Sequence, residues 1–129
     1  MATLTDVQFR SHWSGGDGGA LCLWDGSKAE LSRCAITNNQ CVNHGAVVAL
    51  GVTGTESTRN VAMFEATASV FADNSAGVAG GVVYADGGGG YTNPWHRRVV
   101  TMDGCALHGN SAGVLQDTAN IIGGASTAG

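Results

Sequence analysis

The chain has 129 residues, and its 10 acidic and 6 basic side chains give a net charge of −4. This balance excludes the basic surface that nucleic-acid binding requires, and no apolar run approaches the ~18–20 residues of a membrane span. Hydrophobic residues make up 43% of the chain, which is enough for a single folded domain over residues 1–129. The 21 glycines and the 12% of charged residues disfavour long exposed helices.

The predicted elements recur as four repeats along the chain. Each repeat has a bulky apolar anchor followed three positions later by a polar residue, in the order Phe9/His12, Ile36/Asn39, Phe71/Asn74 and Leu107/Asn110. Each repeat predicts a strand that ends at the anchor, a tight turn, a corner rich in glycine and a second apolar strand. The second strands are predicted at 20–23, 47–50 and 82–85, and the variable connections at 24–28, 51–60 and 86–98.

Anchors spaced 27, 35 and 36 residues apart are typical of a parallel β-solenoid, in which like residues stack at the strand spacing of ~4.8 Å. We therefore expect an all-β fold, a right-handed parallel β-helix of about four coils. Three ladders of apolar side chains should line its interior: Phe9, Ile36, Phe71 and Leu107; Leu4, Leu31, Ala66 and Met102; Leu21, Val48 and Val83. The asparagines should turn inward and bind backbone groups at the corner.

The fourth repeat departs from the pattern because Gln116 and Asp117 occupy the expected Gly-Gly positions. Two alternatives remain open. Either the corner changes at these residues, or an insertion of six residues moves it to Gly123-Gly124-Ala125.

The third repeat, with Phe71-x-x-Asn74-Ser75-Ala76 followed by Gly80-Gly81-Val82-Val83, resembles the FxxN and GGA[ILV] repeats of polymorphic outer-membrane proteins. Gly18-Gly19-Ala20-Leu21 fits the second of these motifs. The resemblance spans roughly residues 3–125 and implies a right-handed β-helix of the pectin-lyase-like class. It also implies an extracellular or cell-surface location. No signal peptide is recognised in the sequence, and the membrane-embedded barrel of that family is not found.

The outward positions of the first strands form two polar columns. One contains Thr3, Glu30, Glu65 and Thr101, and the other contains Thr5, Ser32, Thr67 and Asp103. Glu30 and Glu65 should lie on adjacent repeats, where two carboxylates could share a cation or act as the acid and the nucleophile of a retaining glycosidase. We take Glu30, Glu65 and Asp103 as the candidate catalytic residues. The alternative is a solvated face that tolerates two glutamates.

The longest connection, 86–98, contains a candidate binding set of aromatic and cationic side chains: Tyr91, Trp95, His96, Arg97 and Arg98. Such side chains can stack on a sugar or contact a protein partner. The alternative is a surface loop whose tryptophan folds back onto the wall of the solenoid.

The cysteines and histidines have no metal-ligand spacing, so we expect no metal and no cofactor. Cys34, Cys41 and Cys105 fall at inward positions as small core residues, whereas Cys22 falls at an outward position. A bridge between Cys34 and Cys41 stays open as an alternative.

Function is less constrained than the fold. The leading hypothesis is a non-enzymatic recognition or structural module, such as an adhesin-like protein or a component of a filament or assembly. The alternative is a sugar-binding module or a carbohydrate-active enzyme, either a polysaccharide lyase or a glycoside hydrolase. Because a solenoid has two open ends with unpaired backbone groups, we expect self-association or another subunit there. Carbohydrate is a candidate ligand, and neither nucleic acid nor a membrane span is expected.

Overall fold

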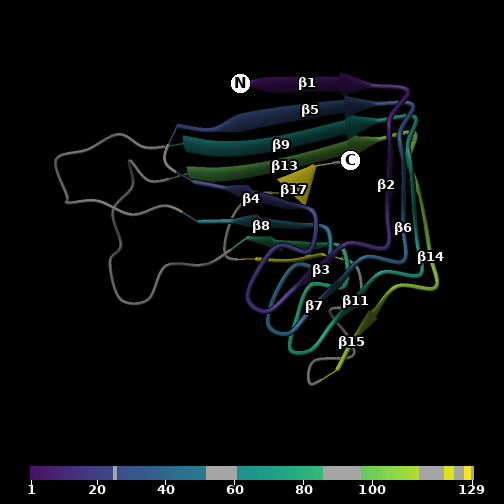
Figure 1. The fold of residues 1–129 in the computed structure, drawn as a ribbon. Coiled ribbons are helices and arrows are strands. Elements are labelled where there is room, and N and C mark those ends of the chain that lie inside the picture. Colours follow the sequence, from purple (N-terminus) through teal and green to yellow (C-terminus); the bar gives the residue numbers. More distant parts are fainter. Residues whose placement is uncertain (25, 52–60, 86–96, 114–120, 124–126, 129) are drawn as a thin grey trace, which may run out of the picture.

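The computed structural model describes all residues except 25, 52–60, 86–96, 114–120, 124–126 and 129. In this part of the chain every regular element is a β-strand, and the strands form four parallel sheets, here called A to D. Each successive repeat adds one strand to every sheet (Figure 1). This arrangement of stacked parallel strands is consistent with a β-solenoid.

The strands occur in the order A, B, C and D within each repeat. Sheet A contains β1 (Ala2–Thr5), β5 (Lys28–Ser32), β9 (Val61–Thr67), β13 (Arg97–Asp103) and β17 (Thr127–Ala128). Sheet B contains β2 (Gln8–Arg10), β6 (Ala35–Thr37), β10 (Val70–Ala72) and β14 (Ala106–His108). Sheet C contains β3 (Trp13–Ser14), β7 (Gln40–Cys41), β11 (Ser75–Ala76) and β15 (Ser111–Ala112). Sheet D contains β4 (Leu21–Leu23), β8 (Val48–Leu50), β12 (Val83–Ala85) and β16 (Ile121–Gly123).

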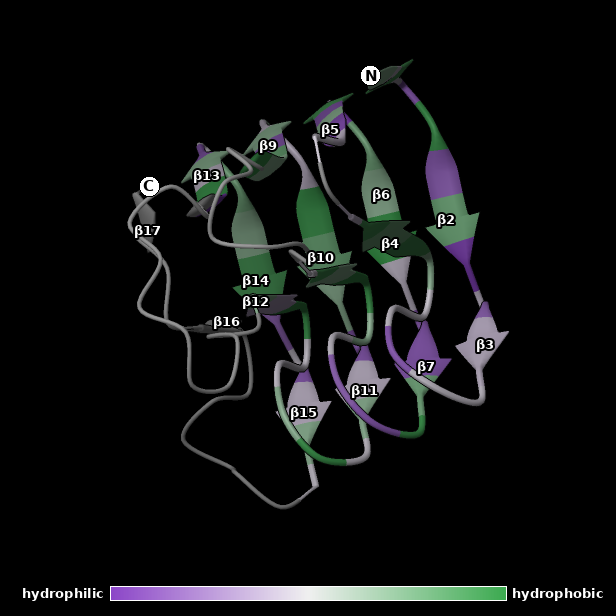
Figure 2. Ribbon diagram, turned by 90° about the vertical axis from the view of Figure 1, so that its left-hand side faces the viewer, coloured by the Kyte–Doolittle hydropathy of each residue, from purple (hydrophilic) through white to green (hydrophobic). Residues whose placement is uncertain are grey.

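The repeats stack with equivalent residues directly opposite one another, as the strands of sheets B and C show in Figure 2. In sheet B, Phe9 pairs with Ile36, Ile36 with Phe71 and Phe71 with Leu107. In sheet D, Leu21, Val48 and Val83 are paired in the same way. The predicted apolar ladders are therefore confirmed.

The main core lies between sheets A, B and D. Along β9 alternate side chains are buried, and Phe64 from this strand packs edge-on against Phe71 of β10 with ring centroids 6.3 Å apart. Because side chains alternate across a strand, the residues between the buried ones face outward. This alternation places Glu30 and Glu65 on the outer face of sheet A.

The strand that leads to each anchor is divided into two, which the sequence did not predict. The break falls at one residue with a left-handed backbone in every repeat: Asp6, Arg33, Ala68 and Gly104. Their φ angles lie between 47° and 60°. Since only the fourth repeat has a glycine there, the usual sign of a positive φ is missing from the other three.

The asparagine ladder is confirmed and runs through the corner that follows sheet B. Asn39 and Asn74 are fully buried. Asn74 Nδ2 donates to the Ile36 carbonyl at 3.0 Å and to Asn110 Oδ1 at 2.9 Å, while Asn74 Oδ1 accepts from the Asn39 backbone N–H at 3.0 Å. Each asparagine thus reaches back to the preceding repeat, where its oxygen accepts from the backbone N–H of the equivalent corner residue and its amide donates to the carbonyl of that repeat's anchor.

The fourth repeat resolves one of the open alternatives. Ile121 pairs with Val83, 38 residues earlier, whereas the anchors Leu107 and Phe71 are 36 residues apart. Gly123 ends β16 opposite Ala85. The alternative of a six-residue insertion with the corner at Gly123 is therefore wrong, because β16 lies only two residues further along the chain than the anchor spacing predicts. Gln116 and Asp117 lie outside the described residues.

Two element boundaries and the last strand also differ from expectation. β5 begins at Lys28 and β13 at Arg97, so the predicted connections 24–28 and 86–98 are shorter than expected at their C-terminal ends. Thr127 and Ala128 pair with Val100 and Thr101 of β13, so the tail extends sheet A. Among the described residues, no helical segment has the length and hydropathy needed to cross a lipid bilayer.

Candidate functional site

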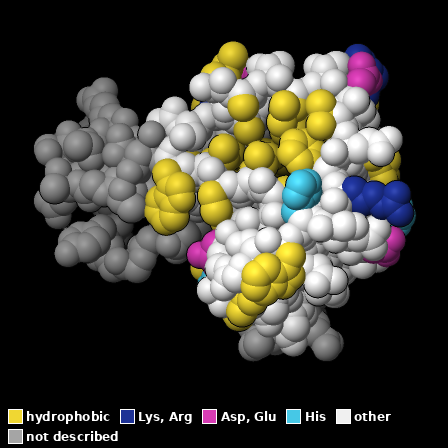
Figure 3. Space-filling model, viewed as in Figure 1, with side chains coloured by type: hydrophobic (Ala, Val, Ile, Leu, Met, Phe, Trp, Pro, Cys, Tyr) yellow, Lys and Arg dark blue, Asp and Glu magenta, His cyan; other side chains and the backbone are white. Residues whose placement is uncertain are grey.

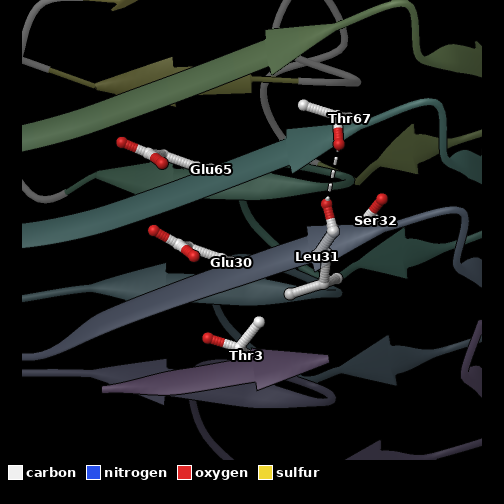
Figure 4. Close-up of a pocket in the computed structure, with 6 residues that line it drawn as sticks. All are labelled: Thr3, Glu30, Leu31, Ser32, Glu65 and Thr67. Atoms are coloured by element: carbon white, nitrogen blue, oxygen red, sulfur yellow. Dashed lines mark hydrogen bonds between the residues drawn. The ribbon is translucent and has the colours of Figure 1, made fainter. Parts of the chain in front are cut away.

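The outer face of sheet A brings the two candidate glutamates together. Glu30 of β5 pairs in register with Glu65 of β9, and Thr3 of β1 pairs with Glu30 on the other side. Both glutamate side chains are about one-third exposed. Figure 4 shows them extending from adjacent strands to the same side of the sheet.

A lysine that the sequence analysis did not consider joins these carboxylates. Lys28 Nζ lies 2.6 Å from Glu30 Oε1 and 3.3 Å from Glu65 Oε2. The hydrogen bond to Glu30, followed by that to Glu65, raises the pKa of the Lys28 ammonium above its usual value. Lys28 precedes Glu30 by two residues on the same strand, so the period of two places both on the outer face. The spacing of two residues could therefore have identified Lys28 as a neighbour of Glu30 from the sequence.

The glutamates line a shallow depression together with Thr3, Leu31, Ser32 and Thr67. Its volume is about 220 Å³, below the ~300–1,000 Å³ typical of small-molecule sites. Thr67 Oγ1 donates to the Leu31 carbonyl at 3.5 Å, so one of the hydroxyls already has a partner (Figure 4). The depression therefore presents two carboxylates that are held by a cation, rather than a deep pocket with free acids.

Asp103 is not brought into this group. It ends β13 and pairs in register with Thr67, in the neighbouring outward column. It is exposed and does not line the depression around the two glutamates. The three candidate catalytic carboxylates thus separate into a pair and an isolated aspartate.

The candidate binding set from the longest connection is only partly described. Tyr91, Trp95 and His96 lie outside the described residues. Arg97 and Arg98 are the first residues of β13, and the Arg98 side chain is 9% exposed. Its register partner Ala62 is fully buried, so Arg98 occupies an inward position at the start of the strand. Its Nε has no hydrogen-bond partner. A buried donor without a partner lowers the free energy of unfolding.

A second polar cluster joins repeats 1 and 2 at the corner before sheet D. His44 Nδ1 lies 2.9 Å from Asp17 Oδ1, and the His44 backbone N–H donates to the same oxygen at 3.1 Å. The His44 ring stacks on Tyr84 with a centroid separation of 4.3 Å. Asp17 and His44 each stand eight residues after their anchors, and this shared column could have revealed the pair.

The Cys22 thiol lies beside this cluster and donates to the Asp17 carbonyl at 3.3 Å. Burial, reinforced by the negative charge of Asp17, raises the pKa of Cys22. A protonated thiol is a poor nucleophile, so Asp17, Cys22 and His44 do not form an activated cysteine centre.

All four cysteines are free, which excludes the bridge between Cys34 and Cys41 in this structure. In the part of the chain that is described, no three histidine, cysteine or acidic side chains are arranged to hold a metal ion.

Sequence analysis also missed two exposed tryptophans in the first repeat. Trp13 is 69% exposed, and Trp24, the first residue of the predicted connection 24–28, is 49% exposed. The register shows why Trp13 faces solvent: it pairs with the exposed Gln40 on the outer side of sheet C. Trp24 lies against Gly51, where a Cβ atom would overlap the indole ring.

Comparison with known proteins adds no assignment: no protein-family model, no curated protein and no solved structure matches this chain.

Proposed function

We propose that the chain is a non-enzymatic β-solenoid module for recognition or assembly, comparable to an adhesin-like protein or a filament component. The observation that carries this proposal is the position of Lys28 between Glu30 and Glu65. A retaining glycosidase needs one carboxylic acid and one free carboxylate flanking the scissile bond. Here a single ammonium group holds both carboxylates, and the depression around them is small.

The fold proposed for this module is a right-handed parallel β-helix of about four coils. The resemblance to polymorphic outer-membrane protein repeats and the in-register parallel strands support it. Right-handed crossover is the strong preference for parallel strands within one sheet. A crystal structure with left-handed connections or with open, separate sheets would contradict this architecture.

The test of a non-enzymatic role is a cleavage assay on acidic and neutral polysaccharides, following new reducing ends and unsaturated products. We expect no cleavage by the wild-type chain. Glu30→Gln and Glu65→Gln serve as matched variants, with Thr37→Ala on the outer side of sheet B, away from the depression, as a control. Cleavage that is lost in both glutamine variants, with the fold retained by circular dichroism, would overturn the proposal and favour the enzyme.

A second candidate function is sugar binding, favoured by the exposed indole ring of Trp13. An exposed tryptophan can stack on the apolar face of a sugar ring. A glycan array tests this candidate: binding by the wild-type chain should disappear in Trp13→Ala and persist in Val42→Ala, which alters another exposed apolar residue. No binding by the wild-type chain would reject it.

A further inference from the structure

Apolar side chains are left incompletely covered at the end of the stack that repeat 1 forms. Seven partly buried apolar residues pack against the main core, and five of them belong to repeat 1: Leu4, Val7, Phe9, Ala20 and Leu21. Met1, Trp13 and Trp24 from the same repeat are among the exposed large apolar side chains. Figure 3 looks onto this end and shows apolar side chains gathered across its centre. We call this surface the N-terminal end.

The backbone at the N-terminal end is also unpaired on one side. β1, β2, β3 and β4 each stand at the edge of their sheet among the described strands. An edge strand presents free donors and acceptors that can pair with another chain. The combination of open strand edges and apolar side chains, including aromatic ones, is typical of the centre of a protein interface.

Repeat 1 lacks the asparagine that, in the other repeats, bonds to the backbone of the preceding repeat. Asn39 Nδ2 donates to the Phe9 carbonyl, and Asn39 Oδ1 accepts from the His12 backbone N–H at 3.0 Å. In repeat 1 the equivalent position holds His12, which lacks the carboxamide that makes both bonds. A parallel repeat laid on this edge would therefore leave the backbone N–H at its corner without this partner.

A second feature of repeat 1 also disfavours a parallel repeat stacked on this edge. The Asp17 carbonyl corresponds to the His44 carbonyl, which accepts from Gly18 of the preceding repeat. At Asp17 this acceptor is instead occupied by the Ser14 hydroxyl and the Cys22 thiol, both at 3.3 Å. The Ser14 side chain also accepts from the Gly16 backbone N–H. The part of the edge near sheet C is thus capped locally, while the part formed by β1, β2 and β4 stays apolar.

We propose that a second copy of this chain covers the N-terminal end, packed head to head about a two-fold axis. The charges along β2 and its flanks support this occupant. Asp6 precedes β2, and its carboxylate accepts from Arg33 Nε and Nη2 of the next repeat at 2.8 and 2.7 Å. Each carboxylate oxygen keeps a further acceptor position for a cation of the second copy. Arg10 and His12 lie at the other end of β2. Antiparallel pairing of two β2 strands about Phe9 places Arg10 opposite Gln8 of the second copy and His12 opposite its Asp6. Arg10 then lies diagonally across from the same aspartate, within reach of its long side chain.

This arrangement is self-complementary, because each charged contact occurs twice around the axis. The two Phe9 side chains meet across the axis and continue the apolar ladder from one copy into the other. Head-to-tail stacking would instead place His12 in the asparagine column and leave the backbone link unmade.

The pairing rests on the proposed role in recognition or assembly and gives that role a specific geometry. Cysteine cross-linking tests it in a Cys22→Ala background, which removes the exposed native thiol. Chains with Gln8→Cys are mixed with chains with Arg10→Cys and oxidised with a mild diamide reagent. Directly opposed residues of an antiparallel pair have Cα atoms ~4.5–5.5 Å apart, which is within disulfide range.

The mixture should give a covalent dimer, whereas neither variant alone should, because residues of the same number are then offset along the strands. Thr37→Cys in place of Arg10→Cys is the matched control: it lies in the same column one repeat further in and should give no cross-link. Sedimentation of the wild-type chain at micromolar concentration should show a dimer that dissociates on dilution. Arg10→Glu should weaken the dimer without changing the circular dichroism spectrum.

A wild-type monomer at this concentration would overturn the proposal, and so would a dimer without the mixed cross-link. A series of higher oligomers would indicate head-to-tail stacking and would also overturn it. Polysaccharide cleavage dependent on Glu30 and Glu65 would reject the non-enzymatic role but would leave the cross-linking result intact, so the two failures are distinguishable.

Discussion

At the scale of single residues, the left-handed corner between sheets A and B is the least expected feature of the chain. Ala68 has a φ of 47°, and Gly104 holds the same position in the next repeat with a φ of 60°. An L-residue in this region costs ~1–2 kcal/mol because Cβ approaches the carbonyl oxygen. The corner is tolerated because the stacked repeats on both sides fix it, with the Ala68 backbone N–H donating to the Asp103 carbonyl.

We predict that Ala68→Gly stabilises the protein. Removal of Cβ relieves the unfavourable φ, whereas the greater freedom of glycine in the unfolded chain costs ~0.4–1 kcal/mol. The free energy of unfolding, measured in urea, should rise by about 0.5–1 kcal/mol. Ala106→Gly is the control because Ala106 is also exposed but lies in a regular strand, and it should lower the same quantity. A loss of stability in Ala68→Gly would mean that the corner is not strained.

The Cys41 thiol gives a second prediction at this scale. It is 5% exposed, and burial raises its pKa from 9.0 to about 11. Below pH 9 the Cys41 thiol is protonated in both the folded and the unfolded chain, so its full contribution to the free energy of unfolding is present. As pH rises from about 9 to 11, the unfolded chain releases this proton while the folded chain retains it. Stability should therefore fall across this interval.

Cys41→Ala isolates this effect, because Ala76 and Ala112 hold the same position in the next two repeats. The difference in unfolding free energy between wild type and variant, measured by urea denaturation at several pH values, should be constant below pH 9 and shrink above it. Lys28 also loses its stabilising charge at alkaline pH, but it does so equally in both proteins. A difference that does not vary with pH would contradict the assignment.

At the scale of elements, the asparagine ladder connects the corners of successive repeats. We predict that Asn74→Ala lowers the free energy of unfolding by at least about 2 kcal/mol, since each buried group left unpaired costs ~1–3 kcal/mol. The Asn39 backbone N–H and side-chain amide both lose Asn74 Oδ1, and the Ile36 carbonyl and Asn110 Oδ1 each lose the bond from Asn74 Nδ2. Gln40→Ala, which shortens an exposed side chain in the next strand, is the control and should change stability by less than ~0.5 kcal/mol. Equal losses in the two variants would show that the ladder contributes nothing.

The sequence predicted what a fixed spacing determines. The spacing of Phe71 and Asn74 identifies the third repeat. Alignment of the other repeats to it correctly predicted the register of Ile36, Leu107 and the outward glutamates. It failed at Arg33 and Ala68, because the fold imposes a left-handed backbone that these side chains do not signal. It also failed at β16, where two extra residues shift the strand without any change in the apolar pattern.

The candidate site was predicted less completely than the fold. Column alignment placed Glu30 beside Glu65, but it does not report which long side chain reaches across, and Lys28 does so here. Alternation would also have placed Arg98 inside the fold, had the start of β13 been recognised at Arg97. The missing information was therefore local strand length and side-chain reach, which a pattern of anchors does not contain.

At the scale of the whole molecule, stability should vary from one end of the stack to the other. Each repeat pairs its strands with those of its neighbours, so an inner repeat is paired on two sides and an end repeat on one. The anchors reflect this difference: Ile36 and Phe71 are fully buried, whereas Phe9 remains partly exposed. Opening of repeat 1 therefore exposes less apolar surface than opening of repeat 2, and its free energy should be lower.

Amide hydrogen exchange tests this gradient with bonds that are chemically matched. The backbone N–H of Asp6 donates to the Ser32 carbonyl and that of Arg33 donates to the Thr67 carbonyl, at 3.0 and 3.1 Å, from the same position in repeats 1 and 2. At low protein concentration we predict faster exchange at Asp6 than at Arg33. If the N-terminal end is covered by a second copy, raising the concentration should slow exchange at Asp6 and leave Arg33 nearly unchanged, because only the end repeat gains a neighbour. Uniform exchange at the two positions, at every concentration, would mean that the repeats open together and that the end is no weaker than the interior.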